Sequence, residues 1–551
     1  MEKKTYIILL VIVVLAFCLR FFGLNSNPPS LNWDEISHGY NAYSILKTGS
    51  DEWGQKLPIT NFRAYGDYPL PLNLYLTMPS ILIFGLTGFA IRLPHVILGV
   101  LTVISSFYIA WGVTRNKNIS ILSSLLVAVS PWTFFTSRFV LQSNLSVFLL
   151  ATSLAFFFNR ERSKNYVTYF FILLGLSLFA YNTTRIVAPI ILIVTWILYH
   201  KEKIWSIKNK IILVLFFLPL PFILLNKEAR ARSSVVSIVD QGAINRIETQ
   251  RNNSKLPNIL SKILYNRPVY FLKVVGKNYL GYFSPNFLFI NGGTQYQFSI
   301  PNSGLLAWVS LPFFYLGLYL IFKESLSKNK EYQFLLLVLL IAPIPAAITN
   351  ESFAVLRSSA MIPLPMILSA IGFYYVHGLL KNKQQKIFFI IYFVLLFLIS
   401  GFYLKNYFVD YKIKYSKDWQ YGYKEAYQFV KENNDNYAKI VITKKYGEPH
   451  EFLLFYMQYD PISYKNDKNL NRFNQSNWWW VDGFSKYYFV NDWQIPKEGF
   501  KFVQESKKIV DCKQAKCLLI TSPNNAPKEW SKIKTINFLD GSPAFELYEN
   551  N

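Results

Sequence analysis

Two adjacent carboxylates shortly after the first apolar stretch are the first candidates for chemistry. Asp34 and Glu35 follow Trp33 and open an amphipathic stretch that ends near Gly49. A carboxylate next to an apolar ring can act as a general base that removes the proton of a substrate hydroxyl. Acidic side chains are also stabilised by the unpaired backbone N–H groups at a helix N-terminus, so the two residues could simply cap a helix. The spacing alone leaves both interpretations open.

Three further side chains in the same region could assist such a reaction. Asp67, in the polar segment 61–69, is a candidate second acid that orients a substrate hydroxyl, with His38 and Tyr68 as candidate substrate contacts. Asp67 and Tyr68 could equally lie in a solvated turn, and His38 could have a structural role. The 5 histidines include no pair spaced four residues apart on a helix, so the sequence has no zinc motif. Two or more acids are compatible with a divalent metal, but nothing in the sequence requires one.

Arginines at the ends of apolar stretches form a second candidate group. Arg138, Arg185 and Arg357 each stand at such an end. A guanidinium group binds phosphate bidentately, so three of them could surround one phosphate. The segment from about 226 to 302 is also strongly basic and adds Arg230 and Arg232 as candidates. Its charge could instead serve a general attraction to anionic lipid headgroups.

The elements that position these residues are mostly membrane helices. Of the 551 residues 52% are hydrophobic and only 16% are charged, which excludes an ordinary soluble enzyme and any disordered or fibrous class. A bilayer span needs about 17–25 apolar residues. We expect eleven spans, at 5–24, 91–113, 118–136, 142–159, 166–182, 186–200, 210–225, 303–322, 331–349, 358–377 and 386–404.

One further apolar segment, Leu70 to Leu86, decides the orientation. The basic clusters between the spans fall on the same side as the N-terminal lysines only if this segment does not cross the membrane. Pro69, Pro71 and Pro79 would also break a spanning helix. The positive-inside rule therefore predicts a cytoplasmic N-terminus and an extracytoplasmic C-terminus in the plasma membrane. We expect Leu70 to Leu86 to form a re-entrant or interfacial helix at the outer face.

The net charge of +25 lies almost entirely on the apolar part of the chain. From Asn406 onward the charges nearly cancel, with 21 basic and 18 acidic residues. Excess positive charge between apolar stretches is typical of loops that are held by anionic lipid or kept on the cytoplasmic side. Membrane lipid is therefore an expected partner, and nucleic acid is not.

Three large pieces are expected outside the membrane: a first loop from about 25 to 90, the basic loop from about 226 to 302, and a tail. We expect a membrane domain over 1–405 and an extracytoplasmic α/β domain over 406–551. The tail alternates helical patterns with strand-like ones. The helical patterns cover 423–432 and 450–458, and the strand-like ones cover 439–443, 517–521 and 544–548. Cys512 and Cys517 are spaced for a disulfide across a tight turn, although two free thiols fit the sequence nearly as well.

Several of these segments resemble the family 39 glycosyltransferases. The resemblance rests on four motifs within about 1–404, namely Asn32-Trp33-Asp34-Glu35, Gly66-Asp67-Tyr68-Pro69-Leu70-Pro71-Leu72, Gly85 to Pro94, and Ser130-Pro131-Trp132. Family 39 enzymes are polytopic α-helical membrane proteins of the GT-C fold, related to protein O-mannosyltransferases and to the aminoarabinose transferase that modifies lipid A. Some relatives carry Lys-Pro-Pro-Leu before the interfacial helix, and this chain does not.

The resemblance implies transfer of a sugar from a polyprenyl-phosphate carrier to an acceptor outside the membrane. It gives Asp34 the role of base and Glu35 a supporting role, and it places Arg138, Arg185 and Arg357 near the carrier phosphate, with Arg230 and Arg232 as further candidates. A single displacement would invert the anomeric centre. The acceptor could be a protein, a lipid or a cell-envelope glycan. A transporter or flippase of lipid-linked glycans is the alternative from another class, and a polysaccharide ligase or polymerase differs only in its acceptor.

Overall fold

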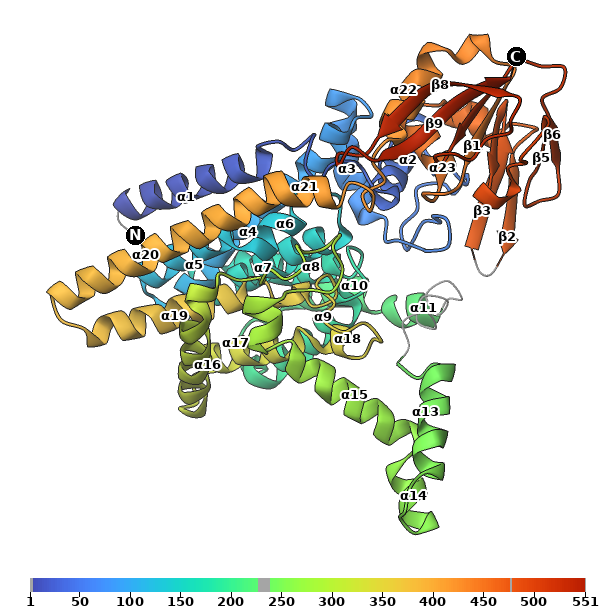
Figure 1. Ribbon diagram of the computed structural model, residues 1–551. Helices are drawn as coiled ribbons and strands as arrows, with labels where there is room; N and C mark the ends of the chain where they lie inside the picture. Colours follow the sequence, from blue (N-terminus) through green and yellow to red (C-terminus); the bar gives the residue numbers. More distant parts are fainter. Residues whose placement is uncertain (1–2, 226–237, 476–477, 551) are drawn as a thin grey trace. The chain divides into compact units, whose positions relative to one another are not determined.

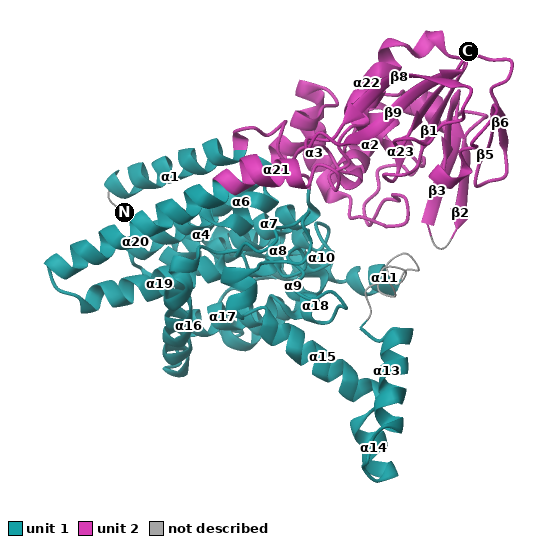
Figure 2. Ribbon diagram, viewed as in Figure 1, with its two compact units in different colours: residues 1–20, 95–137, 141–404 teal, residues 21–94, 138–140, 405–551 magenta. Residues whose placement is uncertain are grey.

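The computed structural model describes residues 3–225, 238–475 and 478–550 (Figure 1). The chain forms two compact units, which Figure 2 shows in different colours. Unit 1 comprises residues 1–20, 95–137 and 141–404, and unit 2 comprises residues 21–94, 138–140 and 405–551. The last passage of the chain from unit 1 to unit 2 lies between Leu404 and Lys405, and the division into domains over 1–405 and 406–551 stays a prediction.

Unit 1 is built from helices. Most of them are rich in Leu, Ile, Val and Phe, and they pack into one large apolar core. The helices that belong wholly or mainly to this unit are α1 (Lys3–Phe21), α4 (Gly88–Thr114), α5 (Lys117–Val129), α6 (Pro131–Thr136), α7 (Gln142–Phe158), α8 (Lys164–Ser177), α9 (Thr184–Tyr199), α10 (Ile207–Phe217), α11 (Leu220–Leu225), α13 (Gln241–Asn252), α14 (Asn258–Leu264), α15 (Arg267–Gly281), α16 (Leu311–Leu326), α17 (Lys330–Ile341), α18 (Ile344–Ala347), α19 (Leu364–Leu379) and α20 (Lys383–Lys405).

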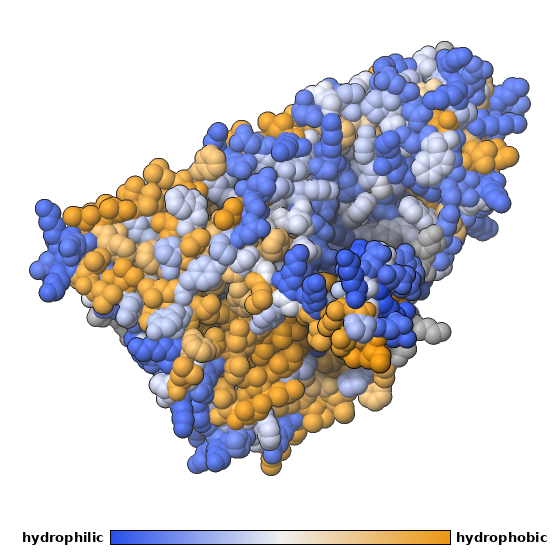
Figure 3. Space-filling view, turned by 60° about the horizontal axis from the view of Figure 1, so that its bottom comes forward, coloured by the Kyte–Doolittle hydropathy of each residue, from blue (hydrophilic) through white to orange (hydrophobic). Residues whose placement is uncertain are grey.

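Seven helical segments in the described part of the chain are long and apolar enough to cross a membrane. Helices α5, α7 and α9 are apolar but shorter. Large apolar side chains such as Phe222, Phe397 and Phe402 are more than two-thirds exposed, and Figure 3 shows wide hydrophobic areas on the face in view. Exposed apolar surface of this extent is typical of contact with lipid. Each of the eleven predicted spans falls on helical structure, whereas the number of crossings stays a prediction.

Unit 2 joins a mixed sheet to helices from the first loop, 25–90, and from the tail. Its sheet has the strand order β2-β3-β4-β1-β7-β9-β8, in which β1 is parallel to β4 and β7 and the other pairs are antiparallel. The helices are α2 (Trp33–Thr48), α3 (Leu72–Phe84), α21 (Lys412–Lys414), α22 (Tyr423–Glu432), α23 (Pro449–Tyr456) and α24 (Pro461–Lys465). The sheet strands are β1 (Lys439–Thr443), β2 (Asn471–Gln475), β3 (Trp478–Phe484), β4 (Tyr487–Val490), β7 (Cys517–Thr521), β8 (Trp530–Asn537) and β9 (Pro543–Asn550), and β5 (Lys501–Val503) pairs with β6 (Ile509–Asp511).

The first loop and the tail share one core. Ile36 of α2 packs in the same apolar cluster as Phe452 of α23 and Ile440 of β1, and Figure 1 shows α2 beside α23. Gly39 permits the close approach of these helices, since a Cβ atom there would lie 2.7 Å from the Phe455 ring. The α/β tail is confirmed, with β1, β7 and α22 at their predicted bounds. The sequence did not predict that α2 folds onto it.

Two other predictions for unit 2 can be compared with the structure. The segment expected to stay out of the membrane forms α3, which has only 13 residues, contains Pro79, and exposes Leu82 and Ile83 at its C-terminal end. The sequence left open whether Cys512 and Cys517 are paired, and in the structure they form a disulfide. Asn550 supports this turn, because its side chain accepts a hydrogen bond from the Cys517 N–H and donates one to the Cys512 carbonyl.

Candidate active site

The first turn of α2 shows which residues cap the helix. The Asn32 side chain accepts a hydrogen bond from the Glu35 N–H at 2.9 Å, and the Asn32 N–H donates to Glu35 Oε2 at 3.3 Å. This pattern is a capping box, in which the residue before the helix and the third helical residue satisfy each other's backbone N–H groups. The capping role is therefore held by Asn32 and Glu35, and not by Asp34.

Glu35 is also the centre of a buried ion pair. Arg92 donates from Nε to Glu35 Oε1 and from a terminal nitrogen to Oε2, both at 2.8 Å, and the Val140 N–H donates to Oε1 at 3.1 Å. The remaining Arg92 hydrogen bonds go to the carbonyls of Leu24, Pro28 and Ser30. Both side chains of the pair are buried, with 1% of the Arg92 side chain and 0% of the Glu35 side chain exposed. This geometry ties the start of α2 to the segment that precedes it and favours a positioning role for Glu35 over a chemical one.

Asp34 lies in a different environment, although it is the next residue. It is exposed, and one of its carboxylate oxygens accepts a hydrogen bond from the Tyr65 hydroxyl. Tyr65 is buried, and both burial and the Asp34 charge raise its pKa well above the ordinary value, so the hydroxyl keeps its proton and remains a donor. Of the two predicted acids, Asp34 is thus the one that is presented to solvent with an oriented carboxylate.

Of the other three first-loop candidates, His38 lies on α2, and Asp67 and Tyr68 lie in the loop between α2 and α3. The His38 Nδ1 lies 2.9 Å from the Asp34 carbonyl oxygen, and burial lowers the His38 pKa to about 4, so the ring is neutral near pH 7. Asp67 lies in the loop before α3, where its side chain accepts a hydrogen bond from the Tyr68 N–H, and its charge opposes the lowering of the His38 pKa. Tyr68 is half-buried near the Arg63 guanidinium. Contact of these three side chains with a substrate stays a prediction.

The predicted arginine group divides between buried and accessible members. Arg138, in unit 2, is fully buried and donates to the carbonyls of Phe22 and Asn27 and to the Tyr407 hydroxyl, a set of contacts that favours a structural role. Arg185, in unit 1, donates to the Leu178 carbonyl and the Asn182 side chain. Arg230 and Arg232 lie outside the described residues.

Arg357 is the most accessible of the described arginine candidates. Its side chain is 24% exposed, and the guanidinium contacts Glu351 Oε2 at 2.9 Å and the Thr349 hydroxyl at 3.1 Å. Both partners belong to the turn between α18 and α19, so the guanidinium is held in place without being enclosed. Of Arg138, Arg185 and Arg357, Arg357 fits a phosphate site best.

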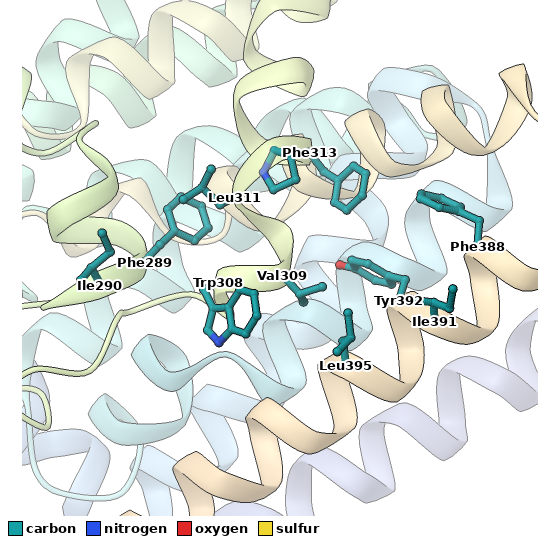
Figure 4. Close-up of a pocket in the computed structure, with 11 residues that line it drawn as sticks. Phe289, Ile290, Trp308, Val309, Leu311, Phe313, Phe388, Ile391, Tyr392 and Leu395 are labelled. Atoms are coloured by element: carbon teal, nitrogen blue, oxygen red, sulfur yellow. The ribbon is translucent and has the colours of Figure 1, made fainter.

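A large apolar cavity lies within unit 1. It has a volume of about 760 Å³ and is walled by Phe289 and Trp308 on one side and by α20 on the other (Figure 4). The short helix Asn286–Ile290 links the cavity to the Arg357 turn, since Phe287 stacks on Phe353 of that turn while Phe289 lines the cavity. Within the described residues, no group of three or more His, Cys, Asp or Glu side chains is arranged to hold a metal ion.

A second set of buried ionisable groups lies where the first loop meets α23. Burial raises the pKa of Glu52 and of Glu448 to about 7 each, and it raises that of Glu451 well above its ordinary value. His450 is also buried, which lowers its pKa well below the ordinary value. The sequence analysis missed these residues because nothing in their local spacing shows that they become buried together.

Sequence reasoning also missed Arg92, Tyr65 and Trp478. The Asn32 to Glu35 spacing could have identified the capping box, because a capping residue followed three positions later by Glu is its usual signature. No comparable local signal links Arg92 to Glu35 or Trp478 to Tyr65.

Comparisons with known proteins show what the sequence and the fold resemble. Residues 67–225, under a third of the chain, match the family described as dolichyl-phosphate-mannose-protein mannosyltransferase. A search of curated proteins finds no match. Among solved structures, the archaeal oligosaccharyltransferase AglB from Archaeoglobus fulgidus, in complex with an inhibitory peptide and a dolichol-phosphate, aligns with 83% of this chain at a TM-score of 0.52 and 14% identity. This chain spans 64% of the length of that protein.

A second solved structure aligns along its whole length. ArnT from Cupriavidus metallidurans, bound to undecaprenyl phosphate, covers 100% of this chain and 99% of its own, at a TM-score of 0.51 and 10% identity. Its apo state gives a TM-score of 0.52. At these identities the likeness concerns the fold, and assignment to family 39 in particular stays a prediction. The chain is a multi-pass membrane protein with the GT-C fold.

Proposed function

We propose that the chain is an integral membrane glycosyltransferase that moves a sugar from a polyprenyl-phosphate donor to an acceptor on the extracytoplasmic side. The observation that carries this proposal is the exposed Asp34 carboxylate, oriented by Tyr65 and set on a helix whose first turn is fixed by the Glu35–Arg92 pair. The GT-C fold supports it, as does the dolichol-phosphate or undecaprenyl phosphate held by the two similar structures.

Asp34 acts as the general base in this reaction. Its carboxylate takes the proton of the acceptor hydroxyl while the hydroxyl oxygen forms a bond to C1 of the sugar. The bond between C1 and the phosphate oxygen breaks, and polyprenyl phosphate leaves with the electron pair. One displacement of this kind inverts the anomeric centre. Asp67 and His38 contact the sugar or the acceptor, and Glu35 positions α2.

The donor lies along unit 1. Arg357 neutralises the charge that develops on the departing phosphate, since it is held by its neighbours yet accessible. The isoprenoid chain occupies the apolar cavity between Phe289 and α20, which the helix Asn286–Ile290 connects to the Arg357 turn. Arg185 is a further phosphate contact. Membrane lipid surrounds the exposed apolar helices.

The active side of the protein faces away from the cytoplasm. The distribution of basic loops supports a cytoplasmic N-terminus and an extracytoplasmic tail in the plasma membrane. The Cys512–Cys517 disulfide supports the same orientation, because disulfides persist in oxidising compartments. A reporter that is active only outside the cytoplasm should work when fused after Lys405 and fail after Lys117, and the reverse pattern would contradict this topology.

The function can be tested with defined donors. Purified protein is mixed with synthetic polyprenyl phosphates that carry different sugars and with an acceptor extract from the cell envelope, and release of polyprenyl phosphate is followed by liquid chromatography and mass spectrometry. We expect release with at least one donor, together with a new sugar on an envelope protein, lipid or glycan. Consumption of a nucleotide sugar in place of every polyprenyl-phosphate sugar would contradict the proposal.

A further inference from the structure

A continuous set of contacts runs from Asp34 into the C-terminal tail. The Tyr65 hydroxyl donates to Asp34, and the Tyr65 ring stacks on Trp478 of β3 with ring centroids 5.0 Å apart and an interplanar angle of 26°. The Trp478 indole N–H in turn donates to Glu448 Oε1 at 2.7 Å. All four residues belong to unit 2.

The contact between Tyr65 and Trp478 is closely fitted. The Trp479 N–H donates to the Tyr65 carbonyl at 2.5 Å, so β3 is hydrogen-bonded to the first loop at this point. Gly66 lies directly against the Trp478 ring, and a Cβ atom at this position would lie 2.2 Å from it. The loop can therefore reach this position only because it carries glycine next to Tyr65.

Glu448 fixes the far end of these contacts. It is 3% exposed and immediately precedes α23, the helix that packs against α2 in the shared core. The tail also holds the first residue of α2, since the Trp33 N–H donates to the Gln420 side chain at 2.9 Å. Both the helix that carries Asp34 and the tyrosine that contacts its carboxylate are thus held by the tail.

We propose that Trp478 and Glu448 are positioning residues through which the tail sets the orientation of Tyr65 and, through Tyr65, of the Asp34 carboxylate. This inference rests on the proposed function of Asp34 as the base. A hydroxyl that donates to one oxygen of a carboxylate restricts rotation of that group. Small displacements of a reacting group are costly, since an error of about 1 Å can lower a rate about 100-fold.

Conservative variants test the contribution of Tyr65, Trp478 and Glu448 to kcat one residue at a time. Tyr65→Phe keeps the stacked ring and removes the hydroxyl, and Trp478→Phe keeps a ring against Tyr65 and removes the indole N–H. Each should lower kcat by about 10- to 100-fold and leave the KM for the donor within about twofold. Glu448→Leu should lower kcat similarly, whereas Glu448→Gln keeps an acceptor oxygen for Trp478 and should restore at least half of the wild-type kcat.

Matched controls exist elsewhere in the tail. Tyr437 donates a hydrogen bond to Glu549 Oε2 at 3.1 Å, and Trp530 donates one to the Gly499 carbonyl at 3.2 Å. Tyr437→Phe and Trp530→Phe therefore remove the same atoms outside the contacts that lead to Asp34, and both should leave kcat unchanged. In the Asp34→Asn background, Tyr65→Phe should have no further effect on kcat, because the group that it positions has already lost its function.

A spectroscopic measurement distinguishes failure of this inference from failure of the proposed function. In protein labelled with 5-fluorotryptophan, the Trp478 fluorine signal is identified by its loss in Trp478→Phe. It should shift in both Tyr65→Phe and Glu448→Leu, and this shift does not depend on any enzymatic activity. An unmoved signal, a full kcat in Tyr65→Phe, or an additive loss in the Asp34→Asn background would each overturn the inference. An inactive wild-type protein with shifted signals would instead refute only the proposed function.

Discussion

The Glu35–Arg92 pair provides a direct test of which acid of the first loop is structural. Glu35→Ala would leave the Arg92 guanidinium buried without its carboxylate, and the N–H groups of Asn32 and Val140 would lose the oxygen that they now contact. Removing one partner of a buried ion pair costs about 3–5 kcal/mol. Glu35 and Arg92 both belong to unit 2. For a unit of that size, a loss of about 3–5 kcal/mol in the free energy of unfolding lowers Tm by roughly 6–20 °C.

The measurement is thermal unfolding of the detergent-purified protein, followed by tryptophan fluorescence. Asp34→Asn is the matched comparison, because Asp34 is exposed and asparagine still accepts a hydrogen bond from Tyr65. A change at such a surface position costs about 0.5 kcal/mol or less, so Tm should move by only about 2 °C. The double variant Glu35→Leu with Arg92→Met should recover much of the lost stability, since apolar residues of similar volume can replace a buried pair.

The opposite pattern would refute this reasoning. If Glu35→Ala kept the wild-type Tm and lost only turnover, Glu35 would act in the chemistry and the ion pair would contribute little to stability. A double variant less stable than Glu35→Ala alone would show that the loss does not come from the uncompensated Arg92 charge.

The remaining predictions concern the donor site, the buried acids and the disulfide. Arg357→Lys keeps the charge but loses the bidentate geometry, so the donor KM should rise about 10-fold while Tm is kept, and an unchanged KM would place the phosphate elsewhere. Burial raises the pKa of Glu52 from 4.5 to about 7, so the folded protein binds this proton more tightly than the unfolded chain does, and stability should fall as pH rises between about 4.5 and 7. Glu52→Gln removes the buried acid and should flatten this dependence in thermal unfolding across that range, whereas an unchanged slope would exclude Glu52 as its cause. Reduction of the Cys512–Cys517 disulfide should lower Tm without changing kcat, because the bridge closes a turn of the tail, and a loss of kcat at constant Tm would contradict this.

The elements that the sequence predicted correctly are those with a strong local pattern. The apolar spans have helical structure, β1, β7 and α22 have their predicted bounds, and α3 is short and contains a proline as expected. Hydrophobic runs and alternation determine such elements locally, so they can be seen in a single chain. The position of Asp34 in the first turn of a helix was foreseen for the same reason.

The contacts that complete the site were not predictable in this way. Glu35 and Arg92 are 57 residues apart, and Tyr65 and Trp478 are more than 400 apart, so no periodicity links them. Arg138 was predicted as a phosphate ligand from its place at the end of an apolar stretch, but its guanidinium is buried among backbone carbonyls. Position along the chain indicates where a side chain starts, and only the packing shows what its charged end contacts.

The most direct test of the central claim is the turnover of Asp34→Asn. Transfer from the active polyprenyl-phosphate sugar is measured with saturating donor, alongside Asp460→Asn, which changes an aspartate that caps α24 in the same unit. If Asp34 is the base, Asp34→Asn should lower kcat by about 10²–10⁴-fold while donor KM and Tm stay near the wild-type values, and Asp460→Asn should keep full turnover. Near-wild-type turnover by Asp34→Asn would remove Asp34 from the mechanism and contradict the claim.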